Sequence, residues 1–168
     1  MSLRRFSYVL AGTSGVFLCL CVYRMIVRRR EDQAHKAIHA MVRAGAWYEL
    51  RQFLETGQAV EFGVLLDIIK PDQMADGQTP LYIAAHQGHE KCVQLLLDAG
   101  AVVDQAMNNG FTPLHTAAVN GNDKCVQLLL GAGAVVDQAM NGGFTPLGIA
   151  AQNGHEKCVQ LLLGAEQT

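Results

Sequence analysis

The residues of this sequence that could carry metal or redox chemistry recur at a fixed spacing. Cys92, Cys125 and Cys158 lie 33 residues apart, and His89 and His155 are separated by twice that interval. Thiolate and imidazole groups are common zinc ligands, and paired thiols can form disulfides. Whether these groups can meet depends on the elements that position them, because each lies in a separate copy of one repeated segment.

The stretch Asp76–Leu163 contains three copies of nearly the same segment. Gly77–Leu81 reads Gly-Gln-Thr-Pro-Leu, and Gly-Phe-Thr-Pro-Leu follows at Gly110–Leu114 and at Gly143–Leu147. Each copy continues with Ala-Ala, a Gly and the sequence Lys-Cys-Val-Gln-Leu-Leu-Leu. A fixed period of this size predicts stacked units, none of which can bury its apolar face alone.

Each copy carries the signals of two helices. Thr precedes Pro, so Thr can cap the first helix while Pro takes the first helical position, where no N–H donor is needed. The Val-Gln-Leu-Leu-Leu run supplies the apolar face of the second helix. Gly100 and Gly133 follow that helix and predict the C-terminal turn that glycine adopts most readily.

The pattern resembles the ankyrin repeat, which reads Gly-x-Thr-Pro-Leu-His-x-Ala-Ala-x-x-Gly-His, then a second helix ending in Leu-Leu, then Gly-Ala. Gly110–Ala118 with Gly121 carries it most fully, and Tyr82 and Gly148 stand where His115 keeps the family histidine. The resemblance implies an all-α solenoid of stacked helix pairs with projecting β-turn fingers. It implies ankyrin repeats at residues 76–108 and 109–141, and a truncated repeat at residues 142–168.

Residues 31–75 are interpreted as a degenerate capping repeat with an apolar insertion. Ile38 and Val42 lie on one helical stripe, and Leu50 lies on a second stripe of the same kind. The stretch from Gly57 to the first Thr-Pro is ten residues longer than its later equivalent and is rich in Val, Leu and Ile. We expect this insertion to fold as an extra turn or short helix, or else to protrude as a contact element.

The spacing argues against a metal site or a disulfide framework. Equivalent atoms of stacked helices lie ~10 Å apart, whereas zinc needs bonds of ~2.0–2.3 Å and a disulfide needs Cα atoms within ~7 Å. The three repeated cysteines are therefore predicted to be buried packing residues, and such cysteines fit a reducing compartment. We found no phosphate-binding glycine loop, nucleophile elbow or pair of catalytic acids, so we expect no enzyme, no cofactor and no metal.

The N-terminal residues 1–30 are predicted to be a transmembrane signal anchor with basic flanks. Phe6–Tyr23 has no charged residue, and its 18 residues span roughly 27 Å of helix. Because Arg24 can snorkel, the membrane segment extends over Phe6–Val27. Two basic residues precede the segment and five follow it closely, so the repeats are expected in the cytosol. A cleaved signal peptide is the alternative.

Two features suggest a homodimer. Ser7, Ala11, Gly15 and Cys19 form a row of small residues along the membrane segment, which would allow two helices to approach closely. At the other end, the sequence stops at Thr168 with the same Leu-Leu-Leu as the interior copies. That edge is expected to fray, to pair with a partner or to mark a shortened gene product.

The charge distribution argues against a nucleic-acid partner. Residues 1–30 hold six Arg and no acidic residue, whereas residues 31–168 hold seven Lys plus Arg and fifteen Asp plus Glu. The repeats are therefore acidic, with a net charge of −8. Binding to a phosphate backbone requires the opposite balance.

The resemblance implies a protein partner that binds the finger tips and the concave groove along the first helix of each repeat. Carried over residue by residue, the candidate binding residues are Gln78, His86, Gln87, Ala106, Asn108, Asn109, Phe111, Val119, Asn120, Asn141, Phe144, Gln152 and Asn153. Phe111 and Phe144 are expected to be the apolar anchors of this surface. The alternative is that each ring packs against its own finger.

The sequence thus predicts a membrane-tethered ankyrin-repeat interaction module, an adaptor or scaffold without catalysis. Two alternatives stay open. The chain could be a secreted or translocated effector whose N-terminal signal is cleaved, or a shortened duplicate with no selected ligand.

Overall fold

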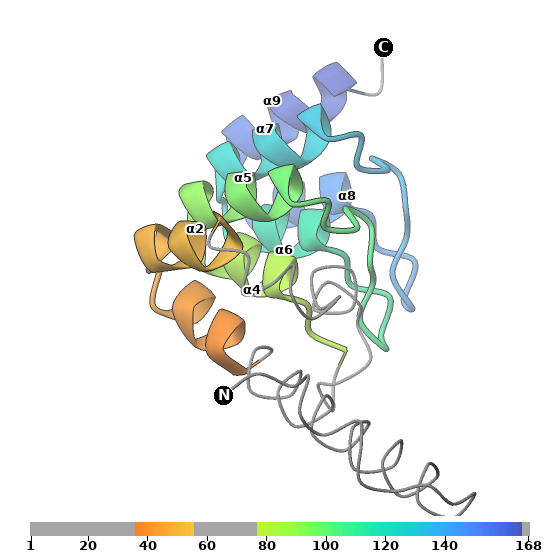
Figure 1. Ribbon diagram of the computed structural model, residues 1–168. Coiled ribbons are helices and arrows are strands. Elements are labelled where there is room, and N and C mark those ends of the chain that lie inside the picture. Colours follow the sequence, from red (N-terminus) through yellow and green to blue (C-terminus); the bar gives the residue numbers. More distant parts are fainter. Residues whose placement is uncertain (1–35, 56–76, 166–168) are drawn as a thin grey trace, which may run out of the picture.

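The computed structural model describes residues 36–55 and 77–165 (Figure 1). All regular elements in these ranges are α-helices: a helix over residues 36–43, then α2 (Trp47–Glu55), α4 (Pro80–Gln87), α5 (Glu90–Asp98), α6 (Pro113–Val119), α7 (Asp123–Gly131), α8 (Pro146–Gln152) and α9 (Glu156–Ala165). The expected helix pairs are therefore present in each of the three repeated segments.

The helices form two rows (Figure 1). Helices α4, α6 and α8 pack side by side in one row, and α2, α5, α7 and α9 follow one another in the other. Each helix of the first row also packs on its own partner, α4 on α5, α6 on α7 and α8 on α9. The predicted all-α stack of helix pairs is confirmed over the described residues.

Threonine and proline set the start of each helix in the first row. Thr79 caps α4 because its Oγ1 accepts a hydrogen bond from the backbone N–H of Tyr82 at 3.1 Å. Thr145 caps α8 in the same way, accepting from Gly148 N at 3.2 Å. The following proline, which needs no helical acceptor, occupies the first turn in each case.

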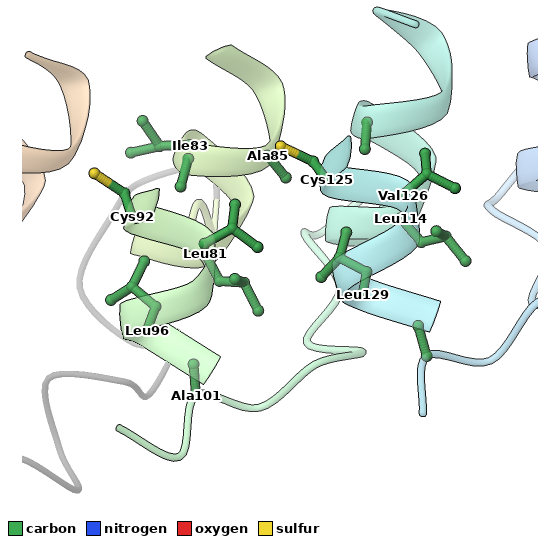
Figure 2. Packing of buried hydrophobic residues seen from close by; sticks show 14 of the residues in the cluster. Leu81, Ile83, Ala85, Cys92, Leu96, Ala101, Leu114, Cys125, Val126 and Leu129 are labelled. Carbon is green, nitrogen blue, oxygen red and sulfur yellow. The ribbon is translucent and has the colours of Figure 1, made fainter. Parts of the chain in front are cut away.

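The core repeats with the sequence. Leu81 and Leu114 come from the first row and face Leu96 and Leu129 of the second, so equivalent residues recur in neighbouring pairs (Figure 2). Burying one such side chain contributes about 1.5–3 kcal/mol. Because each leucine lies between adjacent pairs, this stabilisation depends on the neighbouring unit.

Two long loops project from the stack beyond α5 and α7, and we call them the first finger (residues 101–111) and the second finger (residues 134–144) (Figure 1). Each finger is closed by a backbone hydrogen bond, from Met107 N to Phe111 O at 2.8 Å and from Met140 N to Phe144 O at 3.0 Å. The fingers are also joined to each other, because Asp104 Oδ1 accepts from the N–H of the second finger's Val135 at 3.1 Å.

Some predicted features lie outside the described residues. These are the membrane segment Phe6–Val27, including its row of small residues, and nearly all of the apolar insertion after the capping helices. Within residues 36–55 and 77–165, no helix is both long and apolar enough to cross a membrane. The anchor, the insertion and a dimer through either end of the chain stay predictions.

Candidate functional site

The predicted binding residues gather on one surface, which we call the inner face. It consists of Gln78, helices α4, α6 and α8, and the finger tips at residues 106–111 and 139–144. Nine of the thirteen predicted residues have exposed side chains: His86, Gln87, Asn108, Asn109, Asn120, Asn141, Phe144, Gln152 and Asn153. Four are partly buried: Gln78, Ala106, Phe111 and Val119.

A polar cluster links α4 and α6 on the inner face. His86 Nδ1 lies 2.9 Å from Thr116 Oγ1 and 3.1 Å from Asn120 Nδ2, and Asn120 Nδ2 also donates to the carbonyl of Thr116 at 2.8 Å. An amide nitrogen can only donate, so His86 Nδ1 must accept and the ring proton sits on Nε2. The exposed imidazole therefore offers an N–H donor on this face.

Tyr82 also belongs to the inner face, although the sequence analysis left it out. Its ring lies nearly parallel to the His86 ring, with an angle of 9° between the planes and 6.2 Å between the centroids. The signal in the sequence is the spacing of four residues on one helix, which places the two side chains on the same side. The two rings are therefore stacked one beside the other along α4.

Hydrogen bonds join the finger tips and the helix ends across neighbouring units. The backbone N–H of Asn141 donates to Asn109 O at 3.0 Å, and its Nδ2 donates to Asn108 O at 3.2 Å. Further along, Val119 O accepts from Asn153 Nδ2 at 3.1 Å and from the imidazole Nε2–H of His155 at 2.9 Å. These contacts fix the side chain of Asn141 against the first finger and that of Asn153 against the end of α6.

His115 connects α6 to the second finger. It is fully buried, and its Nε2–H donates to Phe144 O at 3.2 Å. Its Nδ1 accepts from the N–H of Thr112 at 3.3 Å and lies 2.8 Å from Thr112 Oγ1. Burial lowers the pKa of His115 below its usual 6.5, although backbone hydrogen bonds with Phe144 and Gln138 oppose the shift. The neutral ring is thus a structural bridge.

The two predicted aromatic anchors lie in different surroundings. The Phe111 ring is partly buried and tilts against His115, with 5.4 Å between the ring centroids. Phe144 is 50% exposed. Local packing against His115 covers part of the Phe111 ring. The Phe144 ring, on the second finger, is the more exposed of the two.

Comparison with known families decides the identity of the fold. Residues 19–106, 56–140 and 103–168 each match the family model described as Ankyrin repeats (3 copies). The chain belongs to the ankyrin-repeat family. No curated protein matches it. Ankyrin repeats are typically non-catalytic modules that bind protein partners.

The two sides of these ankyrin repeats differ in their content of charged residues. Helices α4, α6 and α8 contain no Lys, Arg, Asp or Glu, and neither do the finger tips. Helices α5, α7 and α9 all begin with an acidic residue followed by lysine. Lys157 of α9 pairs with Asp123 of α7, which lowers the pKa of that carboxyl group.

The repeated cysteines lie inside the ankyrin stack. Cys92, Cys125 and Cys158 are each 1% exposed, and burial raises the pKa of Cys125 to about 11. A thiol of this kind is protonated at neutral pH and is a poor nucleophile. Among the residues that the structure describes, no group of three or more His, Cys, Asp or Glu side chains could hold a metal ion.

A hollow of about 360 Å³ lies outside the inner face, between the turn at Gly45 and the start of α5. Its aromatic wall is Trp47, and Lys91 Nζ lies 4.1 Å from the centroid of that ring. This cation–π contact occupies one face of the ring and contributes about 0.5–1 kcal/mol at an exposed site. Trp47 is nevertheless 36% exposed, so the hollow keeps some open aromatic surface of its own.

Proposed function

We propose that this chain is a non-catalytic adaptor that binds a protein partner through its inner face. The observation that carries this proposal is the combination, on one uncharged surface, of a half-exposed aromatic ring and a row of amides. Cores of protein interfaces are depleted in charge and enriched in aromatic anchors, and their rims are polar. Phe144 fits the anchor, and Asn120, Gln152 and Asn153 fit the rim.

The surface of helices α5, α7 and α9 fits a partner less well. Its exposed positions include Glu90, Lys91, Lys124, Glu156 and Lys157, which are the residues of a solvated helix surface. Surface ion pairs such as Lys157 with Asp123 add only about 0–1 kcal/mol. An exposed aromatic ring adds little to the stability of a folded monomer, whereas it contributes strongly to the binding free energy once a partner covers it.

Proximity labelling in the native cell tests this proposal. The intact chain should label a defined set of proteins, and Phe144→Ala should remove that set without changing expression. Val102→Ala is the matched control, because Val102 is 52% exposed and lies outside the inner face. Equal labelling by the wild type and Phe144→Ala would refute binding at the inner face.

We further propose that Phe6–Val27 holds the repeats at the cytosolic side of a membrane. The absence of charge from Phe6 to Tyr23 and the excess of basic residues after it support this. Carbonate extraction combined with N-terminal sequencing tests it. We expect an uncleaved chain that stays in the membrane fraction. A carbonate-extractable protein whose mature N-terminus lies after Leu20 would instead indicate a cleaved signal and a secreted product.

A further inference from the structure

We infer that the inner face takes a proline-rich, uncharged peptide segment in the polyproline II conformation, lying across α4, α6 and α8. This inference rests on the proposed function, because it names the class of partner that the same surface binds.

The absence of charge selects an uncharged segment. No Lys, Arg, Asp or Glu lies on the three inner helices or at the finger tips. A charged side chain placed there would lose hydration without gaining an opposite charge, which is unfavourable. A segment of proline and small neutral residues avoids that cost.

The spacing of the amides selects the conformation. Gln87, Asn120 and Asn153 hold equivalent positions at the ends of α4, α6 and α8. Packed helices lie 8–10 Å apart, and three residues of a polyproline II helix advance about 9.3 Å and complete one turn. Residues i, i+3 and i+6 of such a segment would therefore all face the amide row. In a β-strand, residues i and i+3 point to opposite sides.

The hydrogen-bonding groups agree with this geometry. A polyproline II segment has no internal hydrogen bonds, so its carbonyl and N–H groups need partners. His86 offers its Nε2–H, and Gln87 and Gln152 offer side-chain amides. Both donors of Asn120 Nδ2 are already used, by Thr116 O and His86 Nδ1, so Asn120 presents its Oδ1 as an acceptor. An α-helical partner would leave these groups without backbone partners, because its own are satisfied internally.

The rings of the inner face suit proline. Tyr82 and His86 are stacked along α4 and present their ring edges and the outer ring face, and Phe144 presents its ring from the second finger. Aromatic-lined grooves bind pyrrolidine rings well, and a preformed polyproline II helix loses little entropy on binding. We therefore place non-proline residues opposite the amides, where an N–H is required, and prolines between them.

A fluorescent, capped peptide of three Pro-Pro-Ala triplets tests the inference on the full 168-residue chain. Fluorescence anisotropy should show saturable binding whose Kd changes less than about twofold between low and high salt, since no charges are involved. Two comparison peptides are used. The first has the same composition but with its three alanines placed next to one another, and the second has Glu in place of each Ala. Both should bind at least about tenfold more weakly, the first through lost register and the second through desolvated charge.

The matched variants are Gln87→Met on the inner face and Gln127→Met on α7, both at exposed positions. Gln87→Met should weaken binding of the triplet peptide about threefold to tenfold, the usual effect of one hydrogen bond. Gln127→Met should leave it unchanged. Equal effects of the two variants, or equal binding of the three peptides, overturns the inference.

The failure of this inference can be told apart from the failure of the proposed function. Suppose that proximity labelling depends on Phe144 while the triplet peptide does not bind. The inner face is then a binding surface for a segment of another kind, and only the inference is wrong. If labelling is also independent of Phe144, both are wrong.

Discussion

The imidazole of His155 lies directly against Gly121 of the preceding repeat. A Cβ atom added at Gly121 would come within 2.6 Å of His155 Nδ1, and the φ angle of Gly121 is +68°. At the same time His155 Nε2–H donates to Val119 O at 2.9 Å, which fixes the ring in this place. Glycine is therefore required at position 121 for two reasons. Its backbone is left-handed, and the His155 ring of the next repeat leaves no room for a side chain.

Gly121→Ala should consequently destabilise the protein by about 2–4 kcal/mol, from roughly 1–2 kcal/mol of left-handed strain plus displacement of the His155 ring. Gly154→Ala is the matched control. Its φ is +73°, but no described atom lies within 4 Å of the added Cβ. Gly154→Ala should therefore lower the unfolding free energy only by the cost of the left-handed strain. Urea unfolding monitored by circular dichroism measures both, and equal losses of unfolding free energy would contradict the contact.

The repeated sequence pattern made much of this arrangement predictable. The Thr-Pro start of each inner helix and the glycine turns followed from local rules, and the structure bears them out: Gly100 and Gly133 have φ angles of +86° and +85°. The buried leucines followed from the period, because equivalent positions of stacked units face the same neighbours.

Contacts that depend on how the copies differ were harder to predict. The two Phe residues occupy equivalent positions, yet Phe111 packs on His115 while Phe144 has Gly148 four residues on. One ring is therefore partly buried and the other half-exposed. Likewise, the bond from Asn120 to His86 needs both residues, whereas Asn153 of the third repeat meets Val119 of the second repeat at the position that corresponds to His86. Both contacts depend on residues in which the copies differ, and the pattern that the repeats share carries no information about them.

His115 should make stability depend on pH. Its pKa is lowered in the folded protein, mainly by burial, so the unfolded chain binds the proton more tightly. The stabilisation is complete above the unfolded value of 6.5 and is lost as the pH falls toward the folded pKa. Melting temperature measured between about pH 8 and pH 5 should therefore drop on the acid side.

His115→Gln isolates this effect. It should lower the unfolding free energy by about 1–3 kcal/mol, because buried groups of Phe144 and Thr112 lose their partner. It should also flatten the acid slope of the melting temperature. A variant that keeps the full slope would assign the pH dependence to other groups.

Gly148 is a site where a substitution should stabilise the repeats. It lies inside α8, and a Cβ there would meet only Thr145 Oγ1, at an ordinary 3.5 Å. Gly148→Ala should add about 0.5–1 kcal/mol, since glycine is a poor helix former. Thermal unfolding should show a rise in melting temperature, opposite in sign to the effect of Gly154→Ala. A fall in melting temperature would mean that α8 does not tolerate a side chain at this position.

The two phenylalanines should separate stability from binding. Phe111 is partly buried against His115, so Phe111→Ala removes packing and should lower the unfolding free energy by about 1–3 kcal/mol. Phe144 is 50% exposed, and Phe144→Ala should cost less than about 1 kcal/mol. Urea unfolding of the two single variants measures both changes, and Leu163→Ala provides an exposed apolar control on α9. A large loss from Phe144→Ala would assign that ring to the fold of the second finger. The ring would then no longer serve as the anchor of a binding surface.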